Sequence, residues 1–262
     1  MKLAVVVQRY GQAINGGAEL HARYVAEGLA RHAEVEVLTT CATDYVTWRN
    51  ALPAGNDEVN GITVRRFRVA QERDPNVFGR ISEKVFSHDH SVADELAWLD
   101  EEGPRSPALL AHLSRADYDY CFFFSARYYH AYHGARACAS KAILVPTAER
   151  DPAIALAIFA PVFRGVRALM YNSPEERAMI GAVARNESVP SVVVGIGSEI
   201  PPHPEPDRFR RKFGIEGRFA IYVGRIDANK GCQQLFDDFD AYRRFSGCLL
   251  YTSDAADEGL GV

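Results

Sequence analysis

The amino-acid sequence predicts an α/β fold in which a parallel sheet carries helices on both faces. Short apolar or β-branched runs alternate with segments of helical periodicity, the pattern of repeated strand–helix units. A Pro- and Gly-rich stretch at residues 195–206 then separates these runs from one further strand–helix unit that begins at residue 219. We expect strands over residues 3–7, 35–39, 62–67, 120–124, 142–145, 168–171 and 192–194.

The helices are predicted from periodicity and from start signals. Leu20, Tyr24 and Leu29 fall on one face of a helix over residues 18–32, which makes the first unit a βαβ opening. Ser173 is a suitable N-cap for a helix over residues 174–184, and Pro174 occupies the first helical position. Another helix is expected over residues 232–244, after the strand at 219–223.

Composition restricts the possible classes of protein. The 262 residues are 47% hydrophobic and 24% charged with a formal charge of −4, which disfavours bulk nucleic-acid binding. The cysteines show no C-x-x-C spacing, so we expect reduced thiols and no zinc site. No apolar run approaches the ~20 residues that cross a bilayer. We therefore expect a cytoplasmic protein whose membrane contact, if it has any, is peripheral at the inner face.

A glycine pair follows the first expected strand. Gly16 and Gly17 stand directly before the helix over 18–32, where glycine lets the backbone approach a ligand. Unpaired amides at a helix N-terminus attract anions such as a diphosphate. The spacing is not G-x-G-x-x-G, so the dinucleotide fingerprint is absent. Taken alone, the loop fits a tight turn without ligand equally well.

A second loop repeats this logic with cations added. Residues 223–231 read VGRIDANKG and precede the helix over 232–244, so Arg225 and Lys230 can converge on a phosphate near its N-terminus. The alternative is a solvated charged loop. The position of the loop at a strand end, where α/β proteins bind ligands, favours the phosphate reading.

The GRIDxxKG segment, together with the GGAE-type loop at 16–19, resembles the family-4 glycosyltransferases of the GT-B fold. The resemblance covers residues 1–247, because the stretch at 142–152, the helix after Ser173 and the GIGS segment at 195–198 also follow the family's order. It implies two facing Rossmann-like domains and sugar transfer from a nucleotide diphosphate sugar with retention of configuration. It also implies that no metal or other cofactor is needed.

Carried over residue by residue, the resemblance implies a diphosphate site made of Gly16, Gly17, Gly224, Arg225 and Lys230. The two cations would neutralise the diphosphate leaving group, whose charge grows as the glycosidic bond breaks. Preorganised charges of this kind commonly contribute about 3 kcal/mol each to catalysis.

The resemblance leaves the catalytic residue unassigned. Many relatives read PTAHDEP where this chain reads PTAERDP at 146–152, so Glu149 stands in the place of a histidine thought to support catalysis. Glu149 is a candidate for that role. Alternatively, Glu149 and Asp151 bind acceptor hydroxyls, or Glu149 has a structural role only.

Further acceptor-site candidates follow the strand over 120–124. Arg127 and His130 begin a loop at a carboxyl strand end, where loops face the ligand cleft. His130 and His133 would share a helix face, yet no third metal ligand accompanies them. Packed or surface histidines are the more common outcome for such a pair.

The sequence after residue 247 has a different character. Residues 248–258 read CLLYTSDAADE, which resembles one reading frame of a transposon-end sequencing adapter; a natural polar tail is the alternative. We expect an N-terminal Rossmann-like, acceptor-side domain over 1–198, a linker over 199–218, the start of a nucleotide-sugar-binding domain over 219–247, and an adapter-derived tail over 248–262. The family's E-x7-E motif lies downstream of the K-G loop, so we expect the polypeptide as written to be inactive.

Three functions are consistent with these patterns. The leading one is a truncated retaining glycosyltransferase of polysaccharide biosynthesis, which transfers a hexose from a nucleotide diphosphate sugar to a saccharide or lipid-linked acceptor. A noncatalytic nucleotide-sugar-binding or scaffold protein of the same fold is the second. A Rossmann-type oxidoreductase is disfavoured, because neither glycine loop has the dinucleotide spacing.

Overall fold

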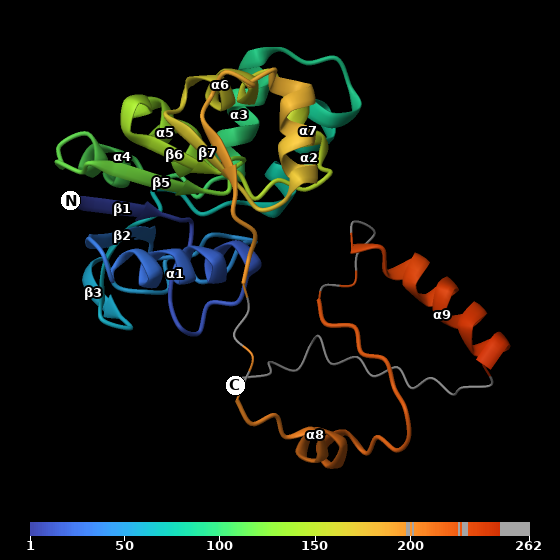
Figure 1. The fold of residues 1–262 in the computed structure, drawn as a ribbon. Helices are drawn as coiled ribbons and strands as arrows, with labels where there is room; N and C mark the ends of the chain where they lie inside the picture. The colour runs from blue at the N-terminus through green and yellow to red at the C-terminus, as the bar shows by residue number, and fades with distance from the viewer. Residues whose placement is uncertain (198–199, 201, 225, 227–229, 247–262) are drawn as a thin grey trace. The chain divides into compact units, whose positions relative to one another are not determined.

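The computed structural model describes residues 1–197, 200, 202–224, 226 and 230–246. The chain divides into two units, Met1–Ile196 and Gly197–Val262. The first unit contains an eight-stranded sheet flanked by helices (Figure 1). Its strands are β1 (Lys2–Val6), β2 (Glu34–Thr40), β3 (Gly55–Val59), β4 (Ile62–Phe67), β5 (Tyr120–Phe124), β6 (Ala142–Val145), β7 (Ala168–Tyr171) and β8 (Ser191–Val193).

The helices of this unit connect successive strands and cover the sheet. They are α1 (Gly17–Leu29), α2 (Pro75–Ser87), α3 (Val92–Glu102), α4 (Pro107–Leu113), α5 (Tyr129–Ala137), α6 (Phe159–Gly165) and α7 (Pro174–Ala184), with short 3-10 turns η1 (Ala139–Lys141) and η2 (Pro152–Ala155). The predicted α/β class with a mostly parallel sheet is confirmed.

The strand order is β3-β4-β2-β1-β5-β6-β7-β8, and the pairs from β4 to β8 are parallel. Val5 of β1 pairs with Val37 on one side and with Phe122 on the other. The chain thus proceeds in one direction from β1 to β4 and in the opposite direction from β5 onward. Ligands of open α/β sheets bind at the carboxyl ends of strands at such a reversal.

Strand β3 was not predicted. It pairs antiparallel with β4, and four of its five residues, GNDE, are exposed and carry no apolar alternation. A strand at the edge of a sheet needs neither face buried, so its sequence gives little signal.

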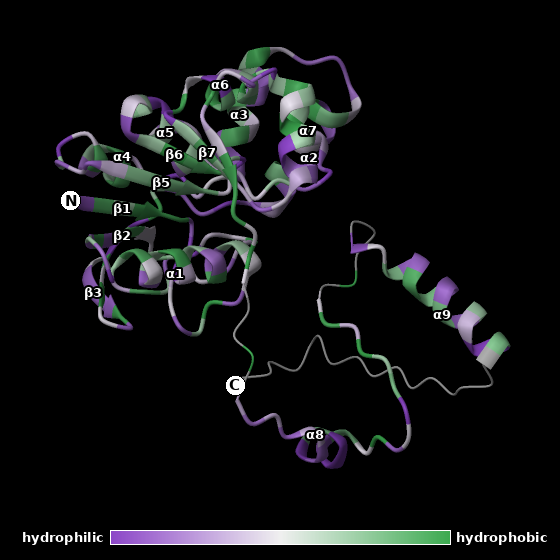
Figure 2. Ribbon diagram, viewed as in Figure 1, coloured by the Kyte–Doolittle hydropathy of each residue, from purple (hydrophilic) through white to green (hydrophobic). Residues whose placement is uncertain are grey.

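Two hydrophobic clusters form the core on opposite faces of the sheet. Leu3 and Val5 of β1 pack with Ala22 and Ala26 of α1 on one face. Ala4 and Val6 point to the other face, where the cluster continues through α3, α4, α5, α6 and α7. The strands are accordingly mostly apolar in Figure 2. Burial on both faces explains the continuous apolar runs that predicted these strands.

The second unit contains α8 (Pro206–Phe213) and α9 (Cys232–Ser246) among its described residues. The expected strand at 219–223 is wrong, because these residues have no regular secondary structure. The ring of Phe219 instead stacks on Phe209 of α8, at 5.8 Å between centroids. A strand needs a neighbour to take its backbone hydrogen bonds, and no strand is formed among the described residues of this unit. Figure 2 shows α8 as strongly hydrophilic.

None of the helices in the described part of the chain combines the length and the apolar character that crossing a membrane requires.

Candidate active site

Apart from His130, which lies in α5, the predicted residues of the first unit lie at the carboxyl ends of three adjacent strands. Gly16 and Gly17 close the loop after β1, Arg127 follows β5, and Glu149 and Asp151 follow β6. Since β1 lies between β2 and β5, these loops surround the reversal of strand order. The candidate residues therefore lie at the position where open α/β sheets usually bind ligands.

The two glycines have different surroundings. A Cβ added at Gly16 would lie 2.1 Å from Glu19 Oε2, whereas one added at Gly17 would meet no atom within 4 Å. Glu19 is fixed, so Gly16 is required by the local structure. Gly17 begins α1 and is exposed, which leaves the helix N-terminus open to an approaching group.

A buried ion pair holds the glycine loop against α1. Arg9 donates to Glu19 Oε1 from Nε at 2.9 Å and from Nη2 at 2.6 Å, and the two side chains are only 9% and 6% exposed. Arg9 also donates to the carbonyls of Thr43, at 2.8 Å, and Asn15, at 3.3 Å. Neither Arg9 nor Glu19 was predicted as a site residue. Glu19 is the acidic residue in the first turn of α1, and that position could have suggested a nearby cation.

Arg127 and Asp151, predicted separately, are joined in the structure by an ion pair from Nη1 to Oδ2. Arg127 Nε also donates to Glu102 Oε1 at 2.6 Å, and Arg73 Nη1 donates to Glu102 Oε2 at 2.8 Å. We call Arg73, Glu102, Arg127 and Asp151 the four-residue charge network. Burial raises the pKa of the Glu102 carboxyl, while the two guanidiniums oppose that shift.

The charge network connects four segments that are distant in sequence. Arg73 follows β4, Glu102 ends α3, Arg127 follows β5, and Asp151 caps η2 by accepting from the Ala153 amide at 2.8 Å. The guanidinium of Arg127 lies 5.5 Å from the Trp98 ring centroid. These contacts bring the acceptor candidates Arg127 and Asp151 together as one unit.

His130 lies away from the surface of this site. The ring is 1% exposed, and its Nε2 lies 3.1 Å from the carbonyl oxygen of Phe124 at the end of β5. Burial lowers the pKa of His130 to about 4, so the ring is neutral at pH 7 and Nε2 can donate its proton to that carbonyl. The structure thus gives His130 a packing position behind the loop that carries Arg127.

Glu149 is exposed, in a loop that is fixed on both sides. Its carbonyl accepts from the Asp151 amide at 2.8 Å, and Asp151 is held by Arg127. On the other side, the amide of Ala148 donates to Glu176 at 2.7 Å. Burial raises the pKa of Glu176, and the amides of Asn172 and Ala148 oppose the shift. The loop therefore presents Glu149 from a constrained backbone.

Two non-glycine residues at the site have left-handed backbones. Ser125 follows β5 with φ 63°, Thr147 follows β6 with φ 49°, and their hydroxyls lie 2.9 Å apart. Such conformations are uncommon, especially for a β-branched residue, and they concentrate at functional sites. Nothing in the sequence marked either residue.

The remaining predicted residues belong to the second unit. Gly224 has φ 153°, and a Cβ there would lie 2.9 Å from the Tyr222 hydroxyl oxygen. Lys230 is exposed and lies two residues before α9 begins at Cys232. Arg225 lies outside the described residues. Convergence of Gly224, Arg225 and Lys230 on a diphosphate stays a prediction.

Within the described residues, no three His, Cys, Asp or Glu side chains are arranged to hold a metal ion. The expectation that no metal is needed stays a prediction.

Comparison with known proteins gives a fold. No family model matches the chain, and no curated protein does. Among solved structures, the chain is similar to "Trehalose-6-phosphate from E. coli bound with UDP-2-fluoro glucose", with a TM-score of 0.60 and 14% identity. The match covers 98% of this chain and 66% of that one, so the chain spans just under two thirds of its neighbour. This likeness shows the fold of a GT-B Rossmann-like domain.

Proposed function

We propose that the chain is part of a GT-B glycosyltransferase of family 4. The enzyme would transfer a hexose from a nucleotide diphosphate sugar to a saccharide or lipid-linked acceptor, with retention of configuration and without a metal. The observation that carries this proposal is the likeness of almost the whole chain to a structure that holds UDP-2-fluoro glucose. The loops at the strand reversal support it, because they offer an open helix N-terminus beside a charged surface.

The roles follow from chemistry. The amides at Gly16 and Gly17 would approach the donor diphosphate, Arg225 and Lys230 would neutralise its charge, and Gly224 would let the backbone come close to it. Arg127, Asp151 and Glu149 would meet the acceptor, with His130 supporting them from behind. The reaction would take place in the cytoplasm, with peripheral contact at the inner membrane face where the acceptor is lipid-linked.

Two alanine variants in the same helix test the donor site. Gly17 and Gly28 both lie in α1 and both have open space at the Cβ position. We expect Gly17→Ala to weaken binding of UDP-glucose or GDP-mannose about tenfold, because its methyl group occupies the approach to the helix N-terminus. Gly28→Ala is the matched control and should bind as the parent does. Isothermal titration that finds no nucleotide sugar binding, or equal binding by both variants, would contradict the proposal.

The replacement of the family's histidine by Glu149 favours one alternative, a noncatalytic nucleotide-sugar-binding or scaffold protein. Assays of hydrolysis and transfer separate the two when they are made on a protein in which the E-x7-E segment is present, because the chain as written is expected to be inactive. Binding of the nucleotide sugar without turnover would support the alternative.

A further inference from the structure

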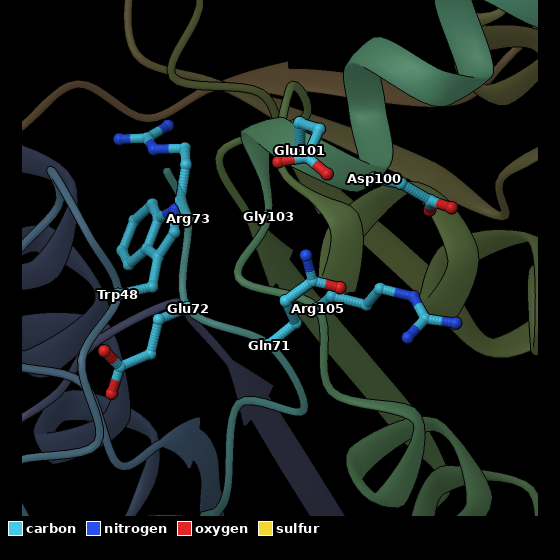
Figure 3. Close-up of a pocket in the computed structure, with 8 residues that line it drawn as sticks. All are labelled: Trp48, Gln71, Glu72, Arg73, Asp100, Glu101, Gly103 and Arg105. Atoms are coloured by element: carbon cyan, nitrogen blue, oxygen red, sulfur yellow. The ribbon is translucent and has the colours of Figure 1, made fainter. Parts of the chain in front are cut away.

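A small pocket lies beside the four-residue charge network and is not used by the roles above. It has a volume of about 260 Å³, and Figure 3 shows the residues around it. Its walls come from the segments that follow β2 and β4 and from the end of α3. The pocket is smaller than the roughly 300–1,000 Å³ typical of drug-sized ligands, so it suits a single sugar unit.

The base of the pocket is rigid. Trp48 is 1% exposed and donates from Nε1 to the carbonyl of Glu102 at 2.7 Å. A Cβ added at Gly103 would lie 3.1 Å from Trp48 Cδ1. Arg73 lies 5.4 Å from the Trp48 ring centroid, and its own donors are taken by Glu102, at 2.8 Å, and the carbonyl of Val46, at 2.8 Å. These groups shape the pocket while their own hydrogen bonds are satisfied.

The rim has polar groups that the fold does not use. Within the described residues, the side chains of Gln71, Glu72, Glu101 and Arg105 make no hydrogen bond or ion pair, although all four line the pocket. In Figure 3 the amide of Gln71 lies near the centre of the view, below Glu101 and beside Arg105. The rim therefore offers both donors and acceptors to a ligand.

The charge of the rim selects among ligands. Three acidic side chains line the pocket, Glu72, Asp100 and Glu101. The basic side chains that line it are Arg105 and Arg73, and the charge of Arg73 is neutralised by Glu102, so the acidic groups outnumber the remaining cation. A phosphate or carboxylate in this space would be repelled. Hydroxyl groups can donate to the carboxylates and accept from Arg105 and the Gln71 amide.

We propose that this pocket binds an uncharged hexose unit of the acceptor and discriminates against phosphorylated sugars. The proposal rests on the proposed function and names the acceptor's chemical class. The charge network supports its connection to the site, because Arg73 both lines the pocket and pairs with Glu102, which leads through Arg127 to the loop of Glu149. A sugar bound here would touch the same unit that positions Glu149.

The test compares two kinds of probe on the full chain. Glucose and mannose are titrated against glucose 6-phosphate and mannose 6-phosphate by saturation-transfer NMR. We expect the neutral hexoses to bind at least about tenfold more tightly than their phosphates. Phosphorylated sugars that bind as tightly as neutral ones would overturn the proposal, as would the absence of hexose binding.

Variants locate the binding. Arg105→Ala and Gln71→Ala should each weaken glucose binding about fivefold, because each removes hydrogen bonds to the ligand. Glu72→Gln combined with Glu101→Gln should reduce the discrimination against glucose 6-phosphate about tenfold. Glu34→Gln, at the opposite end of β2, is the control and should change neither value. Unchanged glucose binding in both Arg105→Ala and Gln71→Ala would overturn the assignment.

A parallel UDP-glucose titration distinguishes two failures. Nucleotide-sugar binding without hexose binding refutes the pocket and leaves the proposed function standing. Hexose binding that depends on Arg105 and Gln71, in a chain that binds no nucleotide sugar, refutes the proposed function and retains the pocket as a sugar-binding site.

Discussion

The buried pair of Arg9 and Glu19 should fasten the glycine loop, and Glu19→Gln tests this directly. The substitution keeps the volume of the side chain and removes its charge, so Arg9 remains buried without an anionic partner. Breaking a buried pair by removing one partner costs about 3–5 kcal/mol. Arg9 keeps its bonds to the carbonyls of Thr43 and Asn15, and glutamine can still accept one bond. We therefore expect the lower value, a loss of about 3 kcal/mol in the free energy of unfolding.

Equilibrium unfolding in guanidinium chloride, followed by tryptophan fluorescence, measures this loss. Both tryptophans, Trp48 and Trp98, lie buried in the first unit, so the signal reports that unit. Glu34→Gln is the control. Glu34 pairs with Lys2 at 3.5 Å, with side chains 71% and 42% exposed, and an exposed pair of this kind contributes at most about 1 kcal/mol.

A double-mutant cycle isolates the pair. Arg9→Met and Glu19→Gln together should cost clearly less than the sum of the single losses, because the second substitution removes the unpaired charge that the first one leaves. If Glu19→Gln costs no more than Glu34→Gln, or if the two losses add, the pair does not hold the loop and the reasoning is refuted.

Three further outcomes are expected. Gly134→Ala should lower the free energy of unfolding by about 1–3 kcal/mol in the same assay, because its Cβ would lie 2.4 Å from Phe123 Cε1; an unchanged midpoint would contradict the packing. The lowered pKa of His130, about 4, means that the unfolded chain binds the extra proton between about pH 6.5 and 4, so stability falls as the pH falls through this window. His130→Gln should flatten that dependence, and equal pH slopes in variant and parent would show another group to be responsible. Ser173→Ala should cost about 1 kcal/mol, since the Ser173 hydroxyl accepts from the Glu176 amide at 3.1 Å. Ser114→Ala should cost less, because the Ser114 hydroxyl caps no helix N-terminus and donates only to the Ala111 carbonyl, at 3.0 Å.

The sequence predicted the parts of this fold that local patterns encode. Central strands such as β1 and β5 are buried on both faces and read as apolar runs, and α7 begins after the Ser173 cap as expected. Strand β3 was not predicted, because an exposed edge strand needs no apolar pattern in its sequence. The strand at 219–223 was predicted from its apolar residues, yet pairing depends on a neighbour that local sequence does not reveal.

The site was predictable only residue by residue. A position after a strand end identified Arg127 as a candidate, a glycine pair before a helix identified Gly16, and the resemblance to a known family drew attention to Asp151. The residues that hold these candidates in place could not be predicted from the sequence. Glu102, for example, lies 25 residues from Arg127 and contacts it only because α3 packs beside the loop after β5. The left-handed backbones of Ser125 and Thr147 could not be predicted from the sequence either, because neither residue type is characteristic of that conformation.

The arrangement around Glu149 favours a functional over a purely structural role for this residue. Buried charges are costly, and a fold that needed only stability would be served as well by apolar side chains at Glu102 and Arg73, whose side chains are 4% and 9% exposed. Here the charge network and Glu176 instead hold both sides of a loop in which Glu149 is exposed. A carboxylate presented on a constrained backbone loses little conformational freedom when it meets a ligand. The buried charges are therefore best explained as the framework that positions Glu149.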